Sequence, residues 1–243
     1  MMRVLALDTS TRAGGVALVE DHRVLDERLG DAGRTHGERL PREILDLLDR
    51  CGLTTADVDL FAVACGPGSF TGLRIGIATQ QGLAFVHRRP MAAVSALEAL
   101  AHAASGEAAP GSVVAAWMDA QRRDVFSAVY RVAPFDVFDP RRLVEIDQPQ
   151  VAAPAVILER WRKADADRPA VFIGDGATAF ADSIGAAYPD ATIMPHPALA
   201  GAIGRIGAAQ AAQGRVTDPA AIRALYIRRP DAEVEREKRQ TTR

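Results

Sequence analysis

The sequence predicts an α/β protein built from two consecutive units with the same order of elements. Three observations indicate this class: short apolar runs bounded by turn residues, apolar residues at helical spacing between those runs, and the return of this order in the second half of the chain. Each unit would hold a three-stranded meander, then a helix, a strand and a further helix. The two halves share little sequence, so the duplication is inferred from element order.

The first unit opens with apolar runs at residues 3–10, 14–20 and 23–29, which predict an antiparallel meander. An amphipathic helix follows, with Pro41 in its first turn and Gly52 as its stop. Its apolar residues recur at helical spacing: Leu40, Ile44, Leu47, Leu48 and Cys51. The rest of the unit is expected to be strand 59–65, helix 71–87, strand 91–95 and helix 96–104.

A stretch rich in small residues, glycine and proline at 105–112 predicts a loop or a boundary. The second unit is then expected to contain strands 113–120, 124–132 and 143–146, helix 156–166, strand 170–174, helix 178–187, strand 191–194 and helix 198–213. We therefore expect an N-terminal lobe at 1–105, a C-terminal lobe at 106–227 and a charged, disordered tail at 228–243. A tail that helps to bind RNA is the alternative.

Composition limits the classes of function. A chain of 243 residues that is 48% hydrophobic can bury a large core, and a formal charge of -2 provides no global basic field for strong RNA binding. Cys51 and Cys65 lie in apolar surroundings, as expected of inert thiols in a reducing compartment. No apolar stretch reaches the roughly 20 residues that cross a bilayer. We expect a cytoplasmic protein with no membrane partner.

The segment "GPGSFTGLRIG" at residues 66–76 joins a predicted strand to a predicted helix. It is not a Walker A loop, because Leu73 and Arg74 follow Gly72 where a lysine is needed. The glycine spacing also departs from the dinucleotide fingerprint, and the residues around Ser69 do not form a hydrolase elbow. The segment is best interpreted as a structural turn.

In this turn, Gly66 and Gly68 would adopt backbone angles closed to other residues, and Ser69 or Thr71 would cap the helix. Two features go beyond a turn. Arg74 in the first helical turn opposes the helix dipole, so either a carboxylate or a phosphate meets it or it is simply solvated. Gly72 and Gly76 form a small-residue stripe that another backbone can approach, either the protein's own sheet or another subunit.

Four segments together resemble the TsaB (YeaZ) family: "LALDTST" near the N-terminus, the glycine loop, "MDAQRRDVFSAVY" at 118–130 and "ALYIRR" at 224–229. The resemblance implies the actin-like/Hsp70-like ATPase (ribonuclease H-like) fold with two duplicated lobes. It also implies a role in making N6-threonylcarbamoyladenosine (t6A) at adenosine 37 of tRNAs that read codons beginning with A. TsaB proteins resemble the transferase TsaD and act as its non-catalytic partner, together with the ATPase TsaE.

The resemblance also directs attention to catalytic and nucleotide-binding groups. TsaD-like enzymes hold a metal with an H-x-x-x-H pair and an aspartate, and no such histidine pair occurs here, so no catalytic residue and no metal are expected. The first phosphate hairpin of the fold corresponds to Asp8, Thr9, Ser10 and Gly14, whereas residues 173–180 lack a second paired-glycine hairpin. We expect no cofactor, with at most weak binding of ATP and Mg²⁺, and interpret Asp8 as a turn residue rather than a metal ligand.

A surface for TsaD is expected on the helices near 38–50 and 71–85, and the same surface would pair two copies of the chain when TsaD is missing. tRNA would be reached indirectly, through the complex. The residues expected at the interface are Leu40, Ile44, Leu47, Gly68, Ser69, Phe70, Gly72, Leu73, Arg74, Gly76 and Ile77.

Other functions stay open at this point. The segment "DTSTRAGG" at 8–15 motivates an independent ATPase or sugar-type kinase of the same fold. A protease centred on Ser69 would need a histidine that the sequence does not place nearby. Arg122 and Arg123 form either an exposed hairpin tip or a contact for tRNA or a partner, with Asp119 and Asp124 flanking them.

Overall fold

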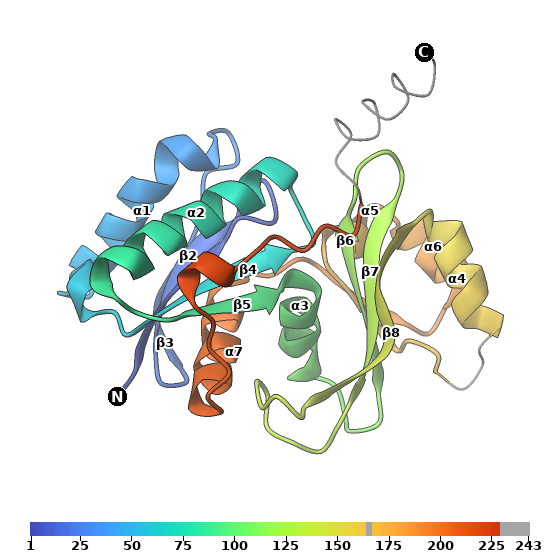
Figure 1. Cartoon of the computed structure of the whole chain (residues 1–243). Coiled ribbons are helices and arrows are strands. Elements are labelled where there is room, and N and C mark those ends of the chain that lie inside the picture. The colour runs from blue at the N-terminus through green and yellow to red at the C-terminus, as the bar shows by residue number, and fades with distance from the viewer. Residues whose placement is uncertain (164–166, 229–243) are drawn as a thin grey trace, which may run out of the picture.

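The computed structural model describes residues 1–163 and 167–228 as two five-stranded sheets, each flanked by helices (Figure 1). Sheet A has the strand order β3-β2-β1-β4-β5, and sheet B the order β10-β9-β6-β7-β8. Read from its other edge, sheet B has the order β8-β7-β6-β9-β10, which corresponds strand by strand to sheet A. In both sheets the central strand pairs antiparallel with one neighbour and parallel with the other. This repetition confirms the duplicated α/β architecture.

The strand bounds follow the predicted runs closely, with β8 longer than expected. Sheet A contains β1 (Arg3–Asp8), β2 (Gly15–Glu20), β3 (Arg23–Leu29), β4 (Leu60–Gly66) and β5 (Met91–Ser95). Sheet B contains β6 (Val113–Asp119), β7 (Val125–Val132), β8 (Leu143–Ala152), β9 (Val171–Ile173) and β10 (Thr192–Met194).

Helix α1 (His36–Arg50) begins earlier than predicted. Thr35 and Glu38 form a capping box at its start, in which each residue satisfies a backbone amide of the other. The predicted position of Pro41 in the first turn is therefore wrong, because Pro41 lies further inside the helix. The apolar side of α1 packs on β2 and β3.

Helix α2 (Phe70–His87) starts as the glycine loop predicts. Gly66 and Gly68 have φ values of 127° and 152°, and the Ser69 hydroxyl accepts a hydrogen bond from the Gly72 amide at 3.2 Å. The glycines thus supply backbone angles that L-residues rarely adopt, and Ser69 is the cap.

Helices α3 (Ala96–Ser105) and α7 (Ala200–Ala212) are exchanged between the units. Helix α3 follows sheet A in sequence but packs on β6 and β7, whereas α7 follows sheet B and packs on β1, β2 and β4. Glu27 of β3 accepts the Gly201 amide at the start of α7 at 2.7 Å. In Figure 1, α3 lies between the two sheets, and α7 lies against sheet A next to α3. A linear division at residue 105 therefore does not follow the packing of these two helices.

The outer side of sheet B is covered by α4 (Pro154–Lys163), α5 (Asp175–Ala179) and α6 (Ala181–Ala187). The predicted helix at 178–187 is divided at Phe180, whose backbone leaves helical geometry. Short 3₁₀ turns occur at Thr55–Asp57 and Pro219–Ala221. Among the described residues, no helix is both long and apolar enough to span a membrane.

Candidate functional site

A cleft of about 1000 Å³ opens between the two lobes. It is lined by the β1–β2 turn, the loop before α1, the glycine loop, the β6–β7 turn and the C-terminal residues 225–228. These segments are far apart in sequence, and the two lobes bring them together. The C-terminal segment, red in Figure 1, runs from the side of α2 to the β6–β7 turn.

The same turn chemistry occurs at the end of β1 and at the end of β6. Asp8 Oδ1 accepts the Ser10 amide at 2.8 Å, and Asp119 Oδ1 accepts the Gln121 amide at 2.8 Å. The Ser10 hydroxyl also donates to Asp8 Oδ1 at 2.6 Å. Asp8 is a turn residue, as the sequence indicates, and its carboxylate is buried.

Further amides at the cleft floor are bonded within the chain. Asp175 Oδ1 accepts the amides of Asp119 and Gly176 at 3.0 and 2.9 Å, and the Thr11 hydroxyl accepts the Gly14 amide at 3.1 Å. Backbone amides in such turns and at helix starts are the groups that bind phosphate in nucleotide sites. Here the amides of Ser10, Gly14, Asp119, Gln121 and Gly176 are already bonded to side-chain oxygens of the chain, so they are not free for a phosphate.

The glycines of α2 face the chain's own β1–β2 turn. A Cβ on Gly72 would lie 2.2 Å from the Thr9 carbonyl oxygen, and a Cβ on Gly76 would lie 2.2 Å from Thr9 Oγ1. The Ser69 amide also donates to the Ser10 carbonyl at 2.7 Å. The close neighbour of the small-residue stripe is therefore the protein's own turn.

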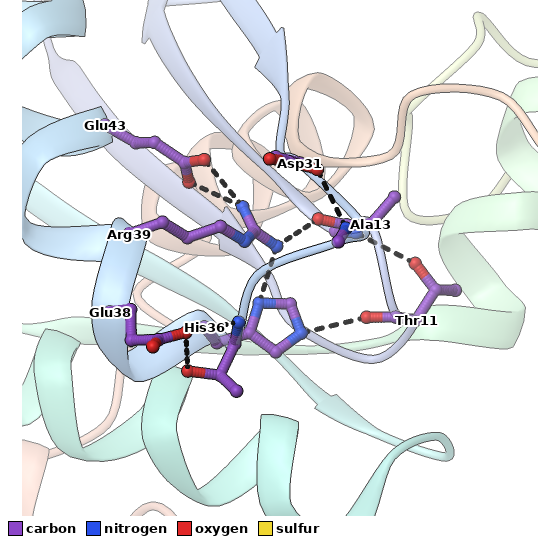
Figure 2. A network of polar contacts seen from close by, with 10 residues as sticks. Thr11, Ala13, Asp31, His36, Glu38, Arg39 and Glu43 are labelled. Carbon is purple, nitrogen blue, oxygen red and sulfur yellow. Dashed lines mark hydrogen bonds and ion pairs between the residues drawn. The ribbon is translucent and has the colours of Figure 1, made fainter.

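A buried polar network holds the other side of this turn (Figure 2). Arg39 donates to the Ala13 carbonyl oxygen and pairs with the Glu43 carboxylate at 2.7 Å. It also donates to Nδ1 of His36 at 2.8 Å, so the His36 proton is on Nε2, which donates to the Thr11 carbonyl at 3.0 Å. Burial, and then the Arg39 charge, lower the pKa of His36. The turn is fixed by a neutral imidazole.

Most residues predicted at a partner interface belong to the core of the first lobe instead. The side chains of Leu40, Ile44, Leu47, Leu73 and Ile77 are between 0 and 6% exposed. The apolar side of an amphipathic helix packs on the sheet of its own lobe, which explains why these residues are buried and not exposed to a partner. Gly72 and Gly76 are likewise buried, whereas Ser69 and Arg74 are exposed and Phe70 and Gly68 half-buried.

Arg74 has a partner that the sequence analysis did not consider. Its Nε donates to the hydroxyl of Tyr226 at 2.9 Å, and its guanidinium lies over the Phe70 ring, 3.9 Å from the centroid. The Phe70 and Tyr226 rings are 5.0 Å apart. Among the described residues, the contacts of this guanidinium are thus the Tyr226 hydroxyl and the Phe70 ring rather than a carboxylate, and a phosphate partner stays a prediction.

The β6–β7 turn is strained and tied to the same segment. Gln121, Arg122 and Arg123 have φ values of 60°, 56° and 66°, in the left-handed region, and all are exposed. Arg228 donates to the Ala120 carbonyl at 2.6 Å and pairs with Asp124. Arg228 belongs to the predicted disordered tail but is held in place here, while 229–243 lie outside the described residues.

The sequence analysis missed His36, Arg39 and Tyr226. Two local signals point to α1: Thr35 and Glu38 fit the capping-box spacing, and Arg39 and Glu43 are four residues apart on one helix face. Tyr226 has no comparable signal, since its contacts come from a helix far away in the sequence.

Comparison with known proteins identifies the chain's relatives. The family model for TsaD, tRNA N6-adenosine threonylcarbamoyltransferase, matches residues 30–214. A "tRNA threonylcarbamoyladenosine biosynthesis protein TsaB" of Bacillus subtilis is 32% identical over 71% of this chain and 71% of its own. The protein of the same name in Haemophilus influenzae is 38% identical over 74% of each chain. The chain belongs to the TsaB (YeaZ) family.

Solved structures agree with this TsaB-family assignment. YeaZ from Pseudomonas aeruginosa is 29% identical, with a TM-score of 0.73 over 93% of this chain and 100% of the other. A P. aeruginosa protein with similarity to peptidase YEAZ gives 31% identity and a TM-score of 0.75 over 94% of this chain. Component A of (R)-2-hydroxyglutaryl-CoA dehydratase from Acidaminococcus fermentans, 13% identical at a TM-score of 0.51, shares the fold alone. The TsaB-family chain has the actin-like ATPase fold, as expected.

Proposed function

We propose that this chain is a non-catalytic subunit in t6A biosynthesis that acts by pairing with a TsaD-type transferase, in an assembly that includes TsaE and reaches tRNA. The names of its relatives support the pathway. The observation that carries the pairing is an exposed, largely apolar stripe on the outer side of the first lobe. We call this stripe the α1/α2 face: Leu45, Thr71, Arg74, Ala78, Gly82, Phe85 and Val86.

The α1/α2 face has the character of a docking surface. Phe85, Val86 and Leu45 are 81, 72 and 58% exposed, and exposed apolar patches on a folded protein mark interaction sites. Thr71, Arg74, Ala78, Gly82 and Phe85 follow one another at helical spacing along one side of α2. Ala78 has only a methyl side chain and Gly82 has none, which lets a partner helix approach closely. The face replaces the buried residues Leu40, Ile44, Leu47, Leu73 and Ile77 in the proposed interface.

The proposal of a non-catalytic role rests on the cleft floor. Ser10, Gly14, Asp119 and Gly176 direct their amides to the chain's own oxygens, which disfavours a nucleotide's phosphates. Calorimetry with ATP and Mg²⁺ on the isolated chain should therefore give no binding tighter than about 1 mM. Micromolar binding with turnover would instead favour an independent ATPase, and would contradict the non-catalytic proposal.

Pairing is tested by co-elution with TsaD of the same organism. Phe85→Asp should abolish co-elution, because the substitution would bury a charge in the apolar contact that we propose. Val156→Asp on α4 is the matched control, since Val156 is 62% exposed in the other lobe, and it should co-elute normally.

Both variants should melt like the wild type, because neither side chain is buried in the chain alone. Retention of the Phe85→Asp variant by TsaD would show that the α1/α2 face is not the docking surface.

Mass-resolved chromatography of the chain alone tests whether it forms a homodimer, whose interface we propose on the same face. Cys51 and Cys65 are unpaired, in keeping with the cytoplasmic location that is part of this proposal.

A further inference from the structure

We propose that the cleft between the lobes binds a single-stranded RNA segment, with Arg12 and Arg34 on its phosphates and a base stacked on Tyr226. The inference deepens the proposed function in tRNA modification, because it gives this chain a direct contact with the RNA. It differs from the sequence-based expectation that tRNA is reached only through the complex.

Exposed charge in the cleft is basic, although the chain as a whole is acidic. Arg12 and Arg34 are exposed and line the cleft from neighbouring loops, and Arg12 Nε is held by the Ala32 carbonyl at 2.9 Å. The cleft's carboxylates, Asp119 and Asp175, each direct an oxygen to backbone amides of the floor. Each carboxylate thus has an oxygen bonded to the chain's own donors, whereas Arg12 and Arg34 are exposed at the cleft, where an anion can reach them.

A prepared stacking surface lies in the same cleft. The rings of Phe70 and Tyr226 are 5.0 Å apart, and the Arg74 guanidinium covers Phe70 while its Nε holds the Tyr226 hydroxyl. Tyr226 is nevertheless 39% exposed. Aromatic rings and guanidinium planes are the groups on which single-stranded bases stack, without regard to sequence. Because the three side chains fix one another, the surface is ordered before a ligand arrives.

The cleft suits an RNA segment better than a free nucleotide. A triphosphate needs converging backbone amides, and four amides at the floor are already bonded to side chains of the chain: those of Ser10, Gly14, Asp119 and Gln121. A phosphodiester chain needs separated cations and stacking surfaces instead, which the cleft offers. Its volume of about 1000 Å³ is at the upper end of small-molecule sites.

The experiment measures fluorescence anisotropy of a labelled short single-stranded RNA with the full chain at several salt concentrations. The double variant Arg12→Gln, Arg34→Gln should bind about tenfold more weakly and should lower the salt slope by roughly 0.7 for each phosphate that is no longer neutralised. Tyr226→Leu should weaken binding about tenfold with an unchanged slope, since it removes stacking and no charge. Tyr226→Phe keeps the ring and should bind like the wild type.

The matched control is the double variant Arg42→Gln, Arg162→Gln, which removes the same charge from exposed sites outside the cleft and should change nothing. Absence of RNA binding at low salt, equal weakening in the control, equally tight binding of heparin, or displacement of the RNA by micromolar ATP would each overturn the inference. Co-elution with TsaD is measured separately, so the inference and the proposed function fail independently.

Discussion

His102 on α3 is a buried side chain that the fold accepts only in its neutral form. It is 1% exposed, its Nδ1 accepts the Phe138 amide at 3.3 Å, and its ring stacks on that of Phe138. Burial, followed by the charge of Arg142, lowers the pKa of His102 to about 4. The unfolded chain binds a proton on this residue near its ordinary pKa of 6.5.

Stability should therefore fall as pH falls from 6.5 toward 4, the range in which only the unfolded state is protonated at His102. Between pH 7 and pH 5 this group alone costs about 2 kcal/mol of the free energy of unfolding. Urea unfolding at both pH values measures the loss. His102→Gln, which keeps an acceptor for Phe138, should have a flatter dependence, and an equal slope in both proteins would contradict the assignment.

At this scale the sequence predicted some roles well. Ser69 as a cap and Asp8 as a turn residue follow from local chemistry, because their partners are two or three residues away. Leu40 and Ile77 were placed at a partner surface although they are buried, since periodicity locates an apolar stripe but not the neighbour that covers it. Tyr226 could not be predicted, because it lies 152 residues away in the sequence from its partner Arg74.

Helix α2 shows how a whole element depends on glycine at some positions and not at others. Gly72→Ala should destabilise the protein by about 1–3 kcal/mol, because its Cβ would meet the Thr9 backbone oxygen, which cannot move aside. Gly82→Ala is the matched control: it is exposed on the same helix with nothing within 4 Å of the added Cβ, and should stabilise by about 0.5–1 kcal/mol.

Denaturant unfolding of the two variants checks these opposite signs. If both substitutions stabilised the protein, the contact between α2 and the β1–β2 turn would be loose enough to accept a Cβ at Gly72.

Element bounds were predictable where apolar periodicity was strong, as in the meander of β1, β2 and β3. The predicted bounds were wrong where a capping box sets the start of a helix, as in α1, and where a backbone kink divides one, as at Phe180.

The whole molecule is joined more closely than its two-lobe description implies. The sequence predicted the duplication from element order, but not the exchange of α3 and α7, because packing of a helix on a distant sheet leaves no local pattern. One apolar cluster includes Ala6 of sheet A, Val114 of sheet B, Leu100 of α3 and Ile203 of α7. The lobes therefore share a core.

A shared core predicts that the lobes unfold together. Trp117 on β6 and Trp161 on α4 are both buried in the second lobe, so tryptophan fluorescence reports on this lobe, whereas far-ultraviolet circular dichroism reports on both. Guanidinium unfolding followed by the two signals should give the same midpoint, because separation of α3 and α7 would expose the apolar inner face of both sheets to water. A fluorescence midpoint displaced from the dichroism midpoint would mean that each lobe is stable alone, and that the exchanged helices contribute little to cooperativity.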